Sequence, residues 1–315
     1  MSTEKRNENF MLKQSRYSKG KKNVKQYSKN NASKKGGSGK NSYNAYYKKN
    51  DDGFQPKSNG KSNYGKKKYP SKSKGYPKKN AQKPSIKIAF LGGLNEIGKN
   101  ITLVECENDI IIIDCGMAFP DGDMLGVDLV IPDFTYIEQN ADRVKGIILT
   151  HGHEDHIGGL PFLLSKVNVP IYGTPLTLGL VGNKLKEHSL YNQSQLNVIN
   201  AGQSIKLGCM KIDFIHVNHS IPDAVAFAIH TPGGTIVHTG DFKIDCTPIT
   251  GDMIDLSSFA RVGDEGVLAL LSESTNAERP GYTPTERTVS DSLDNLFKSA
   301  ENYRIIIATF ASNVN

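Results

Sequence analysis

One short segment of the chain concentrates side chains that bind metal ions. Residues 151–156 read His-Gly-His-Glu-Asp-His and directly follow an apolar run. Imidazole nitrogens and a carboxylate suit zinc, or manganese and iron where carboxylates make up more of the ligand set. In an extended loop His151 and His153 point the same way, while Asp155 and His156 can turn to a second ion. One loop can therefore serve two metal ions.

The alternative interpretation is a polar surface loop that contains histidines by chance. Only 8 of the 315 residues are histidines, so three within six positions are improbable by chance. An apolar strand pattern precedes the segment, and Gly158 and Gly159 follow it. These features favour a metal site.

Three further polar residues stand where predicted strands open into loops. They are Asp114, His219 and Asp241. An isolated residue of this kind usually forms a turn or a cap. Because strand ends converge on one edge of a packed pair of sheets, we expect these three near the histidine segment.

The elements that position these residues follow from the apolar patterns. Strands are predicted at 86–91, 101–106, 109–114, 144–150, 169–173, 195–199, 204–207, 211–217, 224–230 and 235–239. Helices are predicted at 134–143, 155–167 and 175–186. Since no regular strand–helix–strand repeat is visible, we expect an α/β fold of two sheets packed face to face with helices outside.

The chain divides by composition near residue 84. Residues 1–84 carry 24 Lys or Arg against 4 Asp or Glu, whereas residues 85–315 carry 15 against 28. The first segment has one Leu, one Val and no Ile, so we expect a disordered tail. Eight of the 13 Tyr lie there among lysines. The tail is either an arm that binds nucleic acid non-specifically or a solvated extension without a partner.

The candidate ligands resemble the signature of the metallo-β-lactamase superfamily, which is His-x-His-x-Asp-His, then a single His, then an Asp after a strand. The resemblance implies an αββα sandwich and six metal ligands: His151, His153, Asp155, His156, His219 and Asp241. Asp241 would bridge two ions. Asp114 matches a residue that lies behind the metal loop and orients ligands.

The same resemblance divides the other five ligands between the ions. His151, His153 and His219 would hold the first ion. Asp155 and His156 would hold the second. Zn²⁺ is the expected metal, with Mn²⁺ as the alternative.

Five further segments resemble the bacterial ribonuclease J family, which belongs to the β-CASP subgroup of that superfamily. They are residues 91–100, 127–133, 219–223, 239–245 and 271–276. The likeness runs from about residue 85 to the end of the chain. Glu273 stands where the subgroup has its acidic motif A. Hydrolases of small thioesters or lactams would not be expected to carry that motif.

This resemblance implies a metal-dependent ribonuclease. Metal-bound hydroxide would attack phosphorus and leave a 5′-phosphate and a 3′-hydroxyl, in 5′-to-3′ exonuclease and endonuclease reactions. Asp155 and Asp241 are the expected catalytic residues, which hold and orient the hydroxide. Processing of rRNA and decay of mRNA would be the cellular setting.

The family pattern also predicts the domain limits. We expect a basic tail at 1–84, a metallo-β-lactamase domain at 85–282 and the start of a β-CASP domain at 283–315. The chain ends at Asn315, where the family would have a His, so we expect a truncated β-CASP region. The first ion site would then be complete, and the second would lack one ligand.

The resemblance implies RNA as the partner, with ribosomes or RNA-decay proteins as further candidates, and homodimers or homotetramers for full-length family members. The sequence has no apolar stretch long enough to span a membrane and no secretory signal, and its four scattered Cys fit a cytoplasmic protein. The rival functions are a glyoxalase II-type thioesterase and an inactive RNA-binding fragment.

Overall fold

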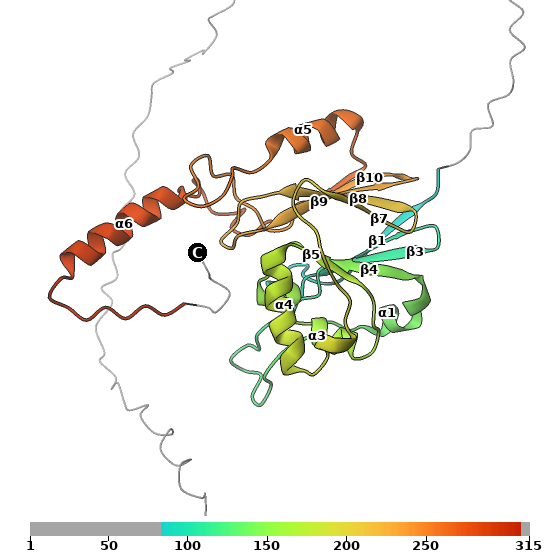
Figure 1. Ribbon diagram of the computed structural model, residues 1–315, viewed down its shortest axis with the longest axis horizontal. Coiled ribbons are helices and arrows are strands. Elements are labelled where there is room, and N and C mark those ends of the chain that lie inside the picture. Colours follow the sequence, from blue (N-terminus) through green and yellow to red (C-terminus); the bar gives the residue numbers. More distant parts are fainter. Residues whose placement is uncertain (1–82, 310–315) are drawn as a thin grey trace, which may run out of the picture. The chain divides into compact units, whose positions relative to one another are not determined.

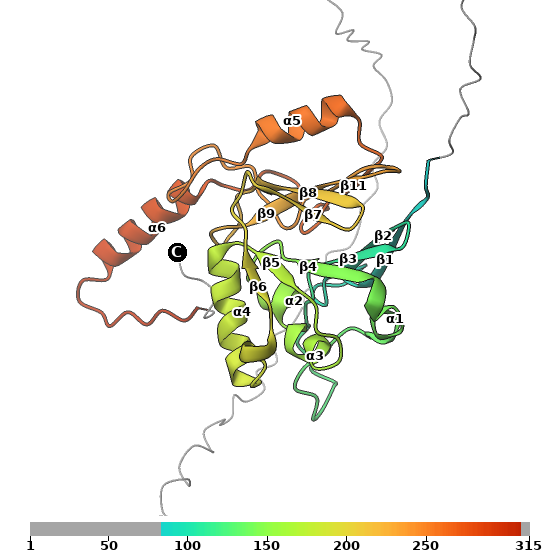
Figure 2. The ribbon, with the colours of Figure 1, turned by 45° about the vertical axis from the view of Figure 1, so that its right-hand side comes forward.

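The computed structural model of the chain describes residues 83–309 (Figure 1). Residues 1–82, which make up almost all of the predicted basic tail, and residues 310–315 lie outside the described residues. The described part contains two β-sheets with helices on their outer faces, as the sequence predicted (Figures 1 and 2). Among residues 83–309, no helix has the length and hydropathy that a bilayer crossing requires.

The first sheet begins as an antiparallel meander and continues with parallel strands. Its order follows the chain: β1 (Ile86–Gly92), β2 (Ile101–Cys106), β3 (Asp109–Ile113), β4 (Val144–Ile148), β5 (Ile171–Gly173) and β6 (Leu196–Val198). The pairs β1–β2 and β2–β3 are antiparallel, and the pairs from β3 to β6 are parallel. The parallel strands open toward the same edge, where the histidine segment follows β4.

The second sheet has the order β11-β10-β9-β8-β7. Its strands are β7 (Ser204–Leu207), β8 (Met210–His216), β9 (Val225–Thr231), β10 (Gly234–His238) and β11 (Ala269–Leu271). All neighbours are antiparallel except β10 and β11. The three-residue strand β11 is not among the predicted strands.

The structure contains two helices that were not predicted, and one predicted helix is broken. They are α1 (Thr135–Gln139), α2 (Glu154–Ile157), α3 (Leu160–Leu164), α4 (Pro175–Glu187), α5 (Leu256–Glu265) and α6 (Glu286–Ser299), with short 3₁₀ turns at Ala141–Arg143 and Tyr191–Gln193. Helices α5 and α6 are not among the predicted helices.

The single helix predicted at 155–167 was wrong, because the chain breaks between α2 and α3. Gly158 and Gly159 lie at the break, against the segment that follows β3. A side chain at Gly159 would place its Cβ 2.7 Å from the carbonyl oxygen of Gly116. The glycine pair thus allows a close approach that a continuous helix with side chains would not.

Alternating side chains divide the interior into three layers. In β3, Ile110 and Ile112 face the layer shared with α1, α3 and α4, whereas Ile111 and Ile113 face the second sheet. On the other side of the second sheet, alanines of β9 pack in the layer that contains Val262 of α5. The order of layers is therefore helix, sheet, sheet, helix.

The layer between the sheets should contribute strongly to stability. Phe214 and Phe227 are almost fully buried there, with ring centroids 5.1 Å apart. Phe227→Ala should lower the free energy of unfolding by about 3–5 kcal/mol, because it removes buried surface and leaves a cavity. Urea denaturation measures this change. Phe119→Ala, at a side chain that is 63% exposed, is the control and should change little. Equal effects would contradict the layer assignment.

Candidate metal centre

The loops that follow four strands meet at one edge of the sandwich. The loop after β4 carries His151 and leads into α2, and Asp114 directly follows β3. His219 follows β8, and Asp241 follows β10. Residues from both sheets therefore converge, as the strand-end pattern predicted.

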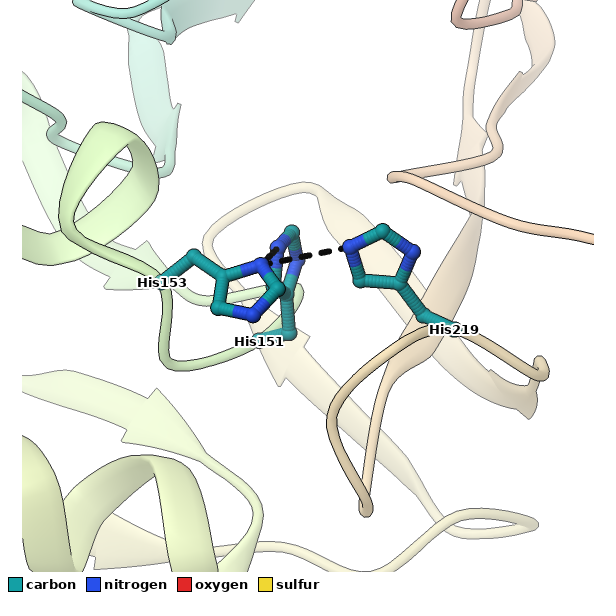
Figure 3. Close-up of side chains that lie close together, drawn as sticks. All are labelled: His151, His153 and His219. Atoms are coloured by element: carbon teal, nitrogen blue, oxygen red, sulfur yellow. Dashed lines mark hydrogen bonds between the residues drawn. The ribbon is translucent and has the colours of Figure 1, made fainter. Parts of the chain in front are cut away.

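Three imidazoles form the first cluster (Figure 3). His151 Nε2 lies 3.1 Å from His153 Nδ1, and His219 Nε2 lies 3.2 Å from the same atom. Ligand nitrogens placed tetrahedrally at about 2.0–2.1 Å from a zinc ion are roughly 3.3 Å apart. The three nitrogens are thus spaced as ligands of one ion would be.

Burial keeps these three imidazoles neutral. It lowers the pKa of His151 well below its usual range and lowers the pKa of His219 to about 4. The pKa of His153 is lowered for the same reason. A neutral imidazole offers a lone pair to a cation, whereas an imidazolium has none. The donor set and its protonation state therefore fit a divalent metal ion.

A second group surrounds His156. Its Nε2 lies 3.5 Å from Asp155 Oδ2 and 3.5 Å from Asp241 Oδ1. The other oxygen of Asp241 lies 3.7 Å from His219 Nε2. The Asp241 carboxylate thus stands between His156 and the first cluster. One ligand atom each from His151, His156 and Asp241 lie within 4.8 Å of one another.

The charges in this group hold one another in their ionised forms. Burial acts to lower the pKa of His156, but the carboxylates of Asp114, Asp155 and Asp241 raise it well above its usual range. Burial acts to raise the pKa of Asp155 and of Asp241, but hydrogen bonding to His156 keeps both below their usual range. Both carboxylates are therefore ionised at neutral pH.

Asp114 holds the histidine loop in place through hydrogen bonds. Its buried carboxylate accepts hydrogen bonds of 2.8 Å from Thr150 N, from Thr150 Oγ1 and from His156 Nδ1. The bond to Nδ1 leaves Nε2 of His156 directed at the carboxylates. Asp114 adopts a left-handed backbone conformation, with φ at 58°. Such strain is uncommon outside glycine and persists only where the surroundings enforce it.

Glu273 lies in the wall of a cavity beside the second group. The cavity has a volume of about 130 Å³, and its lining includes His156, Asp241, Phe90 and Leu94. Glu273 follows β11, and its Oε2 accepts a hydrogen bond of 2.7 Å from the backbone of Thr275. The structure thus brings Glu273 to the candidate site, while its role remains a prediction.

Two further residues border the site, Asn100 and His238. Asn100 places its amide nitrogen 3.1 Å from His156 Nε2. The only sequence signal was its position in the segment 91–100. His238, the last residue of β10, also lines the cavity, and burial lowers its pKa. By contrast, His216 and His230 bond to Asp252 O and to Asp213, respectively, outside both ligand clusters.

Comparisons with known proteins agree with this geometry. Residues 94–282 match the model of the metallo-beta-lactamase superfamily. The chain is 49% identical over 229 residues to Ribonuclease J 1 of Streptococcus pyogenes serotype M3, a match that covers 73% of this chain and 40% of that protein. It is 47% identical over 238 residues to Ribonuclease J2 of Bacillus subtilis, covering 76% of this chain and 42% of the relative. The chain therefore spans about two fifths of the length of these relatives.

A solved structure supports the fold. The crystal structure of a protein of unknown function from Enterococcus faecalis V583 aligns with a TM-score of 0.55 at 18% identity. The match covers 73% of this chain and 61% of the other. Together with the family match, it confirms the predicted metallo-β-lactamase sandwich.

The neutral state of these histidines should make the stability of the fold depend on pH. After removal of metal ions, stability should fall as the pH drops from about 7 to 5. His219 binds a proton near pH 6.5 in the unfolded chain but only near pH 4 in the folded one, so protons favour unfolding. His219→Gln should remove roughly 1–2 kcal/mol of this pH-dependent loss. Urea unfolding at both pH values measures it. An identical loss in both proteins would contradict the assignment.

Proposed function

Because the chain belongs to the metallo-beta-lactamase superfamily and is similar to ribonucleases J, we propose that it is a metal-dependent ribonuclease that hydrolyses RNA phosphodiesters. The observation that carries the proposal is the Asp241 carboxylate, which lies between His219 of one cluster and His156 of the other. Two ligand groups that share a carboxylate suit a pair of cations. Glu273 at the position of the acidic motif A and the Lys- and Tyr-rich tail favour RNA over a thioester as the substrate.

In this proposal the imidazoles of His151, His153 and His219 hold the first cation. Asp155 and His156 hold the second, and Asp241 contacts both. Divalent cations, Zn²⁺ or Mn²⁺, would supply Lewis acidity that activates water and neutralises phosphate oxygens.

The carboxylates orient the water that attacks phosphorus. Asp155 and Asp241 are ionised at neutral pH, because both have pKa values below the usual range. Each can accept a hydrogen bond from the attacking water and take up its proton. The bond from the water oxygen to phosphorus then forms as the bond to the 3′-oxygen breaks, and the 3′-oxygen takes up a proton from solvent, which leaves a 5′-phosphate and a 3′-hydroxyl. Glu273, in the wall of the same cavity, would act as the acidic motif A of the β-CASP subgroup.

The wider biology follows from the same assignment. Residues 85–282 would form the metallo-β-lactamase domain, and residues 283–315, with α6, would begin a β-CASP domain. The enzyme would act from 5′ to 3′ and also internally, in rRNA processing and mRNA decay in the cytoplasm. Ribosomes, RNA-decay proteins and further copies of the chain are the partners that fit this role.

Cleavage of RNA tests the proposal directly. Asp241→Asn should lower the rate on 5′-monophosphorylated RNA at least about 100-fold, because the variant loses the charge shared by both clusters. Asp213→Asn is a matched control, since Asp213 also pairs with a histidine, His230, at 2.9 Å. It should retain activity. Turnover of S-lactoylglutathione without RNA cleavage would instead identify a thioesterase, and binding of RNA without metal-dependent cleavage an inactive fragment.

The basic tail gives a separate prediction. Residues 1–84 carry a net charge of +20 and eight Tyr, which suits contact with phosphates and unpaired bases. Deleting them should weaken binding of single-stranded RNA at least about tenfold at 0.1 M salt and flatten its dependence on salt. Fluorescence anisotropy over a salt series measures both. Unchanged affinity and slope would show that the tail has no part in RNA binding.

A further inference from the structure

Asn100 contacts both residues of the second candidate cation site, although it lies 55 and 56 positions away from them in the sequence. Its backbone N–H donates to Asp155 O at 3.1 Å, and its side-chain Nδ2 donates to the same oxygen at 3.0 Å. Nδ2 also lies 3.3 Å from Asp155 Oδ2 and 3.1 Å from His156 Nε2. One amide group therefore spans the carboxylate and the imidazole.

The hydrogen bonds determine which way this amide points. A backbone carbonyl oxygen only accepts hydrogen bonds, so the atom of Asn100 that faces Asp155 O must be the nitrogen. The same amide nitrogen also donates to Asp155 Oδ2, at 3.3 Å. The amide oxygen points instead toward Gly93, where a Cβ would lie 2.6 Å from it. A glycine at position 93 therefore leaves the space that this orientation of the amide needs.

The backbone of Asn100 is itself held in place. Its carbonyl oxygen accepts a hydrogen bond of 2.9 Å from Gly116 N, in the segment that follows β3. A Cβ at Gly116 would lie 1.6 Å from Asp155 O, so this segment and the metal loop are in direct contact. The amide thus acts from a rigid support, which a positioning group requires.

Asn100 acts on two atoms that face the same space. His156 Nδ1 bonds to Asp114, so Nε2 is the ring nitrogen at which a cation would take the place of the proton. Asp155 Oδ2 lies 3.5 Å from that nitrogen. Without the amide, the Asp155 side chain would have one anchor fewer and could rotate away from His156.

We propose that Asn100 is a positioning residue for the second cation, which it serves by holding Asp155 beside His156. This role rests on the proposed function, because it requires a two-cation centre. Hydrogen-bond partners of metal ligands typically change metal affinity by about 10- to 100-fold when they are removed. The effect should be confined to the second cation, since Asn100 makes no hydrogen bond to His151, His153 or His219 among the contacts of the described residues.

The experiment is a Zn²⁺ titration of the full chain against a competing chromogenic chelator, which gives both dissociation constants. Asn100→Leu removes the amide at similar volume, and Asn100→Ala removes it without any risk of a clash. Asn197→Leu is the matched control, because Asn197 is also half-buried and donates from its amide to a backbone carbonyl, Ile171 O, at 3.2 Å. Far-ultraviolet circular dichroism confirms that each variant is folded.

The proposal predicts that both Asn100 variants raise the dissociation constant of the second Zn²⁺ about 10- to 100-fold and that of the first less than about threefold. Asn197→Leu should change neither. Wild-type affinity for the second Zn²⁺ in the Asn100 variants overturns the role of Asn100 and leaves the proposed function intact. Equal weakening at both sites also overturns it, because it indicates a general structural role. A wild-type chain that binds fewer than two Zn²⁺ overturns the two-cation centre itself.

Discussion

The buried carboxylate of Asp114 is the constraint on which the site depends. A charge without water needs hydrogen bonds to offset its desolvation, and Asp114 takes them from Thr150 and His156. The three bonds tie the end of β3 to the loop after β4. Thr150 Oγ1 in turn lies 3.0 Å from His151 Nδ1, so the ring nitrogens on the far side of both histidines face outward together. Buried residues of the fold, Asp114 and Thr150, thus set the orientation of the histidine ligands.

The sandwich adds what one loop cannot provide. His151, His153, Asp155 and His156 come from the first sheet, whereas His219 and Asp241 come from loops of the second. Packing of the sheets buries the imidazoles. Burial keeps His151, His153 and His219 neutral, so that each can bind a cation. The same packing places a carboxylate between the two groups. Fold stability and ligand chemistry therefore depend on the same contact between sheets.

The sequence predicted the parts of this arrangement that are local. The ligands of the first loop are adjacent in the chain, and Asp114, His219 and Asp241 stand at ends of strongly apolar strands. Helices α5 and α6 were missed although their sequences signal them: in α6, apolar side chains recur at helical spacing on one face, at Val289, Leu293, Leu296 and Phe297. The break at Gly158 and the role of Asn100 depend on contacts between segments far apart in the chain, which periodicity cannot show.

Anomalous X-ray diffraction from crystals of the full chain grown with Zn²⁺ would locate the cations at the histidine loop. Two peaks are expected roughly 3.5–4 Å apart, with Asp241 between them. One peak should lie among His151, His153 and His219, and the other beside Asp155 and His156. Peaks elsewhere, such as at His216 or His230, or no peak at the histidine loop, would contradict this placement of the cations.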